Sequence, residues 1–301
     1  MASTVGEALR AATRRLASAG AAATDAEELL SRLLGVGRGE LRALASRRFD
    51  AEATRRLDEQ LARREAGEPV QYITGRAAFR HLDLAVDRRV LVPRPETEWL
   101  VEAVIEYLDA GDWSLRGPRV LDLGTGSGCI ALSIAAEDAH ASVTATDASD
   151  DALDVARANA ESLGLAARVT FVRGNWFAAL GADDRFDVIV SNPPYIAPAE
   201  ARDLPADVRD WEPHAALFAE GGGLADVREI VEQAPRHLFT GGLLALELAE
   251  SRAAEVAGWL DGARDWHDVE LRDDLAGRPR VLLARREHGP VIAPAQWGEE
   301  G

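Results

Sequence analysis

Hydrophobic positions in the first 67 residues repeat at helical spacing. Thr24 to Glu27 read Thr-Asp-Ala-Glu, a capping-box pattern that predicts a helix start ahead of several leucines, and a later helix is predicted to end near Gly67. The amphipathic faces of the first and last helices of this region are Val5, Leu9, Ala12 and Leu16, and Ala53, Leu57 and Leu61. The pattern predicts a small helical domain over residues 1–69.

From residue 70 onward the pattern changes to alternation. VQYITG, which starts at Val70, and LDLAVDRRVLV, which ends at Val92, alternate like strands and predict a β linker or hairpin over residues 70–95. Helix-like segments then separate further strand-like runs: RVLDLG, SVTATDA, RVTFVRG, FDVIVSN, GLLALELA, HDVELRDD and RVLLARR. These seven runs predict a doubly wound α/β domain over residues 96–285, followed by a flexible tail over residues 286–301.

Composition narrows the class of protein. The chain has 301 residues, of which 47% are hydrophobic, and this is ordinary for a folded chain with a sizeable core. A net charge of -17 argues against an electrostatic grip on duplex DNA and favours a protein partner or a small substrate. A single cysteine, Cys129, excludes an internal disulfide, and the cysteine and histidines have no metal-ligand spacing. No apolar run has the length of a membrane span and no signal peptide is evident, so a cytoplasmic protein without a metal is expected.

The first chemical signal is VLDLGTGSGCIAL, which starts at Val120. A predicted strand leads into Gly124, Thr125, Gly126 and Gly128, and then into a helix of small residues. Glycines at these positions let a ligand approach main-chain N–H groups at the helix start. Because the spacing is G-x-G-x-G, it differs from the dinucleotide fingerprint G-x-G-x-x-G.

An acidic residue follows at the end of the second strand of this region. Asp147 lies 19 residues after Gly128, where a carboxylate can accept hydrogen bonds from both hydroxyls of a ribose. A capping role alone is the alternative for Asp147, since Ser149 is predicted to begin the next helix. The two motifs together resemble the nucleoside half of a class I methyltransferase, which binds S-adenosylmethionine; NAD is the competing ligand.

Asn175 and Trp176 follow the next predicted strand. An amide at this edge of the sheet can bond the edge of an adenine, and an aromatic ring can cover its face. Trp176 fits a plain core position equally well.

The run FDVIVSNPPYIAP places Asn192, Pro193, Pro194 and Tyr195 at the end of the fourth strand. Two prolines fix their φ angles and remove two N–H donors, so the Asn192 side-chain oxygen and the Pro193 carbonyl can accept hydrogen bonds from one planar NH2 group. Such acceptors favour a pyramidal nitrogen and stabilise positive charge on it as a methyl group arrives, and Tyr195 can pack on the acceptor group. A simple strand-ending turn is the alternative.

NPPY resembles a signature of methyltransferases that act on amino and amide nitrogens, and other segments specify the family. The family resembled is the bacterial release-factor glutamine methyltransferases, known as HemK or PrmC, and the resemblance covers nearly the whole chain. The segments that carry it are EPVQYITGRAAF, VLVPRPETEWLVE, DAEELLSRLLG, GTGSGCIAL, VSNPPYI, VRDWEPHAALFA, GGLLALELA and DLAGRPRVLLAR.

The resemblance implies a Rossmann-like seven-stranded methyltransferase sheet with a small N-terminal helical domain that docks the substrate. It implies S-adenosylmethionine as cofactor and class 1 peptide release factors as partners, methylated on the glutamine of their Gly-Gly-Gln tip, with no direct nucleic acid and no membrane. It places Pro93, Arg94, Pro95, Glu96 and Thr97 near the donor and substrate site. The chain departs from the family pattern at Asn175, Trp211 and His214, where acidic, Phe and Arg residues are commoner.

Three other functions share some of these features. A DNA adenine methyltransferase would need a base-flipping, basic recognition region, which is missing here. A ribosomal RNA methyltransferase is the closer alternative, although the N-terminal region has few aromatic side chains for stacking on bases. A nucleoside-binding module without turnover would predict a damaged acceptor motif, whereas residues 192–195 are intact.

Overall fold

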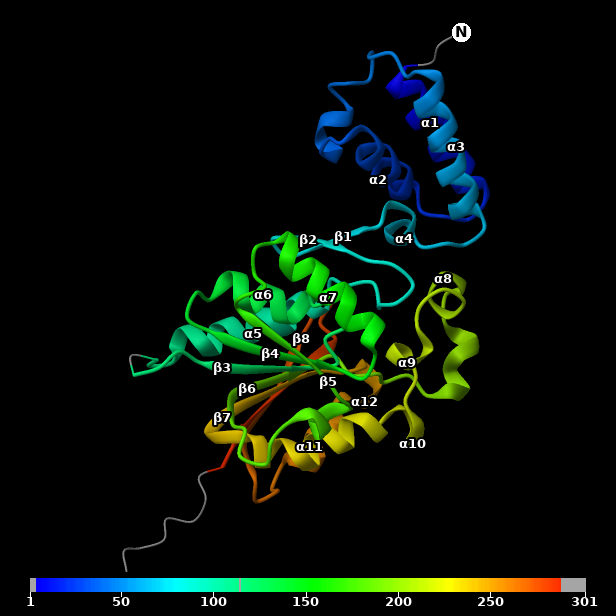
Figure 1. The fold of residues 1–301 in the computed structure, drawn as a ribbon. Helices are drawn as coiled ribbons and strands as arrows, with labels where there is room; N and C mark the ends of the chain where they lie inside the picture. The colour runs from blue at the N-terminus through cyan, green and yellow to red at the C-terminus, as the bar shows by residue number, and fades with distance from the viewer. Residues whose placement is uncertain (1–3, 114, 288–301) are drawn as a thin grey trace, which may run out of the picture.

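A seven-stranded sheet forms the centre of the protein in the computed structural model, which describes residues 4–113 and 115–287 (Figure 1). Its strands, in spatial order, are β5 (Val169–Arg173), β4 (Ser142–Asp147), β3 (Arg119–Leu123), β6 (Phe186–Ser191), β7 (Leu238–Glu247), β9 (Pro279–Arg286) and β8 (Trp266–Asp273). The first five strands in this order run parallel, and β9 and β8 are antiparallel to their neighbours. All seven strand predictions are confirmed.

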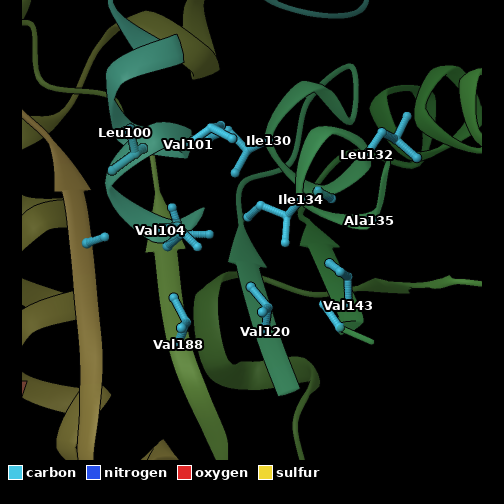
Figure 2. Close-up of a cluster of buried hydrophobic side chains, with 14 of the residues drawn as sticks. Leu100, Val101, Val104, Val120, Ile130, Leu132, Ile134, Ala135, Val143 and Val188 are labelled. Carbon is cyan, nitrogen blue, oxygen red and sulfur yellow. The ribbon is translucent and has the colours of Figure 1, made fainter. Parts of the chain in front are cut away.

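Alternate residues of β3, β6, β7 and β9 enter two separate hydrophobic cores, because successive side chains of a strand point to opposite faces. Val120 packs into one core while its neighbour Leu121 packs into the other. Figure 2 shows the first core, in which side chains of α5 and α6 meet those of β3, β4 and β6. Helices therefore cover both faces of the sheet, as expected for a doubly wound fold.

The helices of this domain follow the strands along the chain. The longer ones are α5 (Thr97–Ala110), α6 (Cys129–Glu137), α7 (Asp150–Ser162), α11 (Ala225–His237) and α12 (Glu250–Leu260). Short helical turns lie between β5 and α11: η2 (Trp176–Ala179), η3 (Pro198–Asp203), α8 (Ala206–Arg209), α9 (His214–Leu217) and α10 (Glu220–Gly223). Ser149 caps α7, because its side chain accepts a hydrogen bond from the N–H of Ala152.

The N-terminal region is helical and has a core of its own, placed above the sheet in Figure 1. It contains α1 (Val5–Ser18), α2 (Ala23–Leu34), η1 (Arg38–Leu41) and α3 (Ala51–Glu65). The capping box predicted at Thr24 is wrong: the N-cap of α2 is Ala22, two residues earlier, and it makes no side-chain capping bond. A complete capping box lies instead at the start of α1, between Thr4 and Glu7.

The predicted β linker is part helix and part hairpin. VQYITG forms the short helix α4 (Val70–Thr74) and not a strand. Its buried residues Val70, Tyr72 and Ile73 do not alternate, since Tyr72 and Ile73 are adjacent and both are buried. The hairpin follows as β1 (Arg76–Phe79) and β2 (Leu82–Ala85), and the predicted strand character of residues 86–92 is absent there. Of the tail predicted at 286–301, residues 288–301 lie outside the described residues.

The described residues contain neither a membrane-spanning helix nor a cluster of metal-binding side chains. No helix in residues 4–113 and 115–287 is long and apolar enough to cross a membrane. Within those same residues, no group of three or more His, Cys, Asp or Glu side chains is arranged to hold a metal ion.

Candidate active site

Polar side chains collect at the edge of the sheet where the parallel strands end. Asp147 ends β4, Asn192 follows β6, and Glu247 ends β7. Because β3, β4, β6 and β7 are parallel and in register, these strand ends lie at one edge, together with the glycine loop after β3. Ligands of open α/β sheets bind at this edge.

The loop after β3 needs glycine for its backbone conformation. Gly124, Gly126 and Gly128 have φ angles of +71°, +56° and +83°, a region that other residues rarely adopt. A Cβ on Gly124 would also lie 3.3 Å from the ring of Trp176. A side chain at Gly124 would therefore be strained and would crowd Trp176.

Asp122, a residue that the sequence reasoning missed, fixes this loop from below. Its buried carboxylate accepts hydrogen bonds from the Thr125 hydroxyl at 2.6 Å and from the N–H of Ala131 at 3.2 Å. Burial raises the pKa of Asp122 to about 7, although both hydrogen bonds oppose that shift. A charged residue inside the apolar run VLDLG was the available signal.

Asp147 is held by backbone donors. Its Oδ2 accepts from the N–H of Gly126 at 2.9 Å, and its Oδ1 accepts from the N–H of Ser149 at 2.9 Å. Each carboxylate oxygen can accept two hydrogen bonds, so each keeps capacity for a further donor. Asp147 therefore has a fixed position and keeps acceptor capacity for a further donor.

A cavity of about 290 Å³ opens in front of this loop. Six of the eight residues predicted to bind a cofactor line it: Gly124, Gly126, Asp147, Asn175, Trp176 and Asn192. Thr125 is buried below the loop, and Gly128 is the N-cap of α6. Trp176 both lines the cavity and belongs to the core, and its Nε1–H donates to Asp226 at 3.1 Å.

A second cavity, of about 330 Å³, adjoins the first. Five residues predicted to contact substrate line it: Arg94, Asn192, Pro193, Pro194 and Tyr195. Leu91, Asn192, Pro194 and Ala216 line both cavities. Asn192 thus lies where the two cavities meet.

A chain of side-chain hydrogen bonds holds Asn192. Its Nδ2 donates to the Thr97 hydroxyl oxygen at 3.1 Å, and that hydroxyl donates to Oε2 of Glu247 at 2.6 Å. The Tyr195 hydroxyl lies 3.4 Å from the other carboxylate oxygen, Oε1. Burial raises the pKa of Glu247 to about 7, with the Thr97 hydrogen bond acting in the opposite direction. Glu247 was not singled out from the sequence, although a charge in the apolar run LLALELA was a signal.

The PRPETE segment contributes to the site unequally. Arg94 lines the second cavity and binds both carboxylate oxygens of Glu212 at 2.7 Å. The side chain of Glu212 is only 2% exposed, and burial raises its pKa despite the charge of Arg94. Glu96 lies 3.9 Å from Arg278, a partly exposed pair. Pro93 and Pro95 line neither cavity, and Thr97 acts beneath Asn192.

Trp211 and His214, two residues at which the chain departs from the family pattern, make contacts outside the lining of both cavities. Trp211 stacks under the Arg88 guanidinium, 3.9 Å from the ring centroid. His214 lies 3.0 Å from the carbonyl oxygen of Arg209 through its Nε2. Neither side chain lines a cavity at the strand ends.

Comparison with known proteins agrees with this geometry. Residues 7–75 match the family model of the PrmC N-terminal domain, and residues 101–207 match that of the methyltransferase small domain. A release factor glutamine methyltransferase of Cereibacter sphaeroides is 43% identical over 281 residues, which cover 93% of this chain and 97% of the relative. This chain belongs to the release factor glutamine methyltransferase family. A family member from Burkholderia pseudomallei is 44% identical over 267 residues, 87% of this chain and 92% of its own length.

Solved structures of methyltransferases share the fold. The catalytic domain of human METTL16 in complex with MAT2A 3'UTR hairpin 6 has a TM-score of 0.55 and 20% identity, and covers 82% of this chain and 85% of that domain. At this identity the likeness shows the fold alone. The family resemblance and the Rossmann-like methyltransferase fold predicted from the sequence are confirmed.

Proposed function

We propose that this protein transfers a methyl group from S-adenosylmethionine to the side-chain amide nitrogen (N5) of the glutamine in the Gly-Gly-Gln motif of class 1 peptide release factors. It would act in the cytoplasm and support translation termination. Family membership supports the reaction. The observation that carries the proposal is the position of Asn192 between two adjoining cavities, one for the methyl donor and one for the acceptor.

The cofactor cavity fits a nucleoside with a charged tail. Asp147 offers free acceptor capacity for ribose hydroxyls, and Asn175 and Trp176 offer an amide and a ring for the base. Gly124 and Gly126 line the cavity without a side chain, which leaves room for the ligand beside the loop backbone. Bound there, S-adenosylmethionine would supply an electrophilic methyl group on a sulfonium sulfur.

The acceptor side fits an amide. The lone pair of an amide nitrogen is delocalised, so the nitrogen is a poor nucleophile. The side-chain oxygen of Asn192 and the carbonyl of Pro193 would accept hydrogen bonds from the two N–H groups of the substrate amide. They would thereby stabilise the positive charge that develops on its nitrogen in the transition state. Pro193 and Pro194 have no N–H groups that would compete for these acceptors. Tyr195, which lines this cavity, would pack on the planar amide.

The helical N-terminal domain, residues 1–69, is proposed to dock the protein substrate. Arg64 on α3 bridges Asp25 at 2.7 Å and Asp207 at 3.3 Å, so the domain contacts α8. The residue next to Asp207 along α8, Val208, lines the acceptor cavity. A release factor held by the N-terminal helices would therefore lie close to the acceptor cavity.

An RNA substrate is the competing proposal, because the fold also occurs in a methyltransferase solved with an RNA hairpin. The net charge of -17 disfavours it, since RNA binding requires clustered positive charge. The test is intact mass spectrometry after incubation with S-adenosylmethionine. A gain of one methyl group on a release factor, absent when its motif glutamine is changed to glutamate and absent from ribosomal RNA, is expected. Methylation of RNA alone would overturn the proposal.

A further inference from the structure

Glu247 stands behind the proposed acceptor site without lining either cavity. It is 1% exposed, and the Thr97 hydroxyl connects it to Asn192. A buried carboxylate is costly unless it is hydrogen-bonded. An apolar residue at this strand end would avoid that cost, so the arrangement calls for a function.

The direction of the hydrogen bonds supplies that function. Above about pH 7, where Glu247 is ionised, its carboxylate can only accept hydrogen bonds, so the single proton of the Thr97 hydroxyl is directed to Glu247. The Thr97 oxygen is then an acceptor toward Asn192, and only the NH2 end of the Asn192 amide can meet it. The carbonyl end of that amide must therefore point the other way, where the cavities lie.

We propose that Glu247 is a positioning residue that sets the orientation of the Asn192 amide through the Thr97 hydroxyl, so that Asn192 presents an oxygen and not an NH2 group to the substrate. This inference rests on the proposed function. With the amide reversed, the NH2 of Asn192 would face the NH2 of the substrate glutamine, and two donors would meet. Tyr195 supports the carboxylate from the other side through its hydroxyl.

Glu247→Gln tests the proposal because glutamine has the same shape but can also donate. A donor at this position lets the Thr97 hydroxyl turn toward Asn192 and permits the reversed amide. The single-turnover methylation rate at saturating S-adenosylmethionine should fall on the order of 10- to 100-fold. The calorimetric affinity for S-adenosylmethionine and the melting temperature should not fall. Glu255→Gln, the same change at an exposed site on α12, is the matched control and should behave as the wild type.

Variants of Thr97 distinguish an effect through the hydrogen bonds from Glu247 to Asn192 from an effect of packing. Thr97→Ser keeps the hydroxyl and should retain most of the rate, whereas Thr97→Val keeps the shape and should lose as much as Glu247→Gln. The double variant Glu247→Gln, Thr97→Val should be no slower than the slower single variant, because both changes break one chain of bonds.

The orientation of the Asn192 amide can be tested directly with a release factor whose motif glutamine is changed to glutamate. The wild type should bind this factor more weakly than the unmodified one, because the Asn192 oxygen would face a carboxylate. In Glu247→Gln the difference in affinity between the two release factors should be smaller, since a reversed Asn192 amide offers a donor to the glutamate carboxylate. A role for Glu247 in packing alone would leave the difference unchanged.

Two results overturn the inference: a Glu247→Gln rate within twofold of the wild type, or equal rates for Thr97→Ser and Thr97→Val. Failure of the proposed function has a different signature, because the wild-type protein itself would then leave the release factor unmethylated.

Discussion

Two strand ends on the same edge of the sheet hold their polar side chains in different ways. Asp147 is fixed by main-chain N–H groups, one of them two residues away along the chain. Asn192 is fixed by the side chain of Thr97, which lies 95 residues earlier in the chain. Thr97 is in turn fixed by the side chain of Glu247, which lies 150 residues after it. A backbone donor survives most substitutions of its residue, whereas a side-chain relay depends on each member. The acceptor site should therefore be the more sensitive of the two to single changes.

The largest effect is expected at Asn192. Asn192→Ala removes one preorganised acceptor, so kcat should fall about 10²- to 10³-fold, with little change in S-adenosylmethionine affinity. Single-turnover rates at saturating cofactor and calorimetry of cofactor binding measure the two quantities. Near-wild-type single-turnover methylation by Asn192→Ala would mean that the NPPY segment is only a strand-ending turn.

Asn192→Asp sharpens the same comparison. An aspartate keeps an acceptor but cannot donate to Thr97, whose own proton is committed to Glu247. The oxygen of Thr97 and the new carboxylate would then face each other without a proton between them. We expect partial activity with an altered pH dependence, and full rescue would contradict the relay.

Asp147→Ala should act on binding and not on the chemical step. Loss of charge-assisted hydrogen bonds to a ribose would weaken S-adenosylmethionine binding by about 1.5–3 kcal/mol, or about 10- to 150-fold in Kd. Asp147→Asn, which keeps one acceptor oxygen, is the control and should lose less. Unchanged calorimetric affinity of Asp147→Ala would remove this residue from the cofactor site.

Arg94→Ala should have a smaller effect, at the rim of the acceptor cavity. Arg94 lines that cavity and neutralises the buried Glu212, so its loss should raise the KM for the release factor by roughly 2- to 10-fold, about 0.5–1.5 kcal/mol. The Kd of S-adenosylmethionine should stay the same, because Arg94 does not line the cofactor cavity. A change in cofactor affinity equal to the change in KM would assign Arg94 to the fold and not to the acceptor site.

The same contrast explains how much the sequence could predict. The seven strands of the sheet, the glycine loop and the Ser149 cap follow from local spacing, and they appear where the pattern places them. The strand prediction for VQYITG failed because the pattern of apolar residues in so short a segment cannot distinguish a strand from a short helix that is buried on most sides. Glu247 and Asp122 were missed because their partners are set by the tertiary fold, although parallel topology already places every strand end at one edge. A charged residue at the end of an apolar strand therefore merits the same attention as a motif.

The smallest expected effect is on stability. Burial raises the pKa of Glu247 from its ordinary value of 4.5 to about 7, and nearby Glu96 raises it further while Arg280 lowers it. The unfolded chain loses this proton near pH 4.5 and the folded chain keeps it to about pH 7, so the stabilising contribution of the neutral carboxyl is complete below pH 4.5 and is lost as the pH rises through 7.

Glu247→Gln removes this titration. Its melting temperature should equal that of the wild type near pH 4.5 and exceed it above pH 7 by roughly 2–4 °C, which corresponds to about 1 kcal/mol in the free energy of unfolding. The gain is small because the glutamine must still bury a polar amide. Glu255→Gln, on the exposed side of α12, should show no such crossover. A variant that is more stable than the wild type above pH 7 and yet slower would show that the buried charge of Glu247 is kept at the expense of stability, for the orientation of Asn192. A Glu247→Gln protein that is less stable than the wild type at every pH would instead make Glu247 a structural residue, and the difference between the two strand ends would be one of packing.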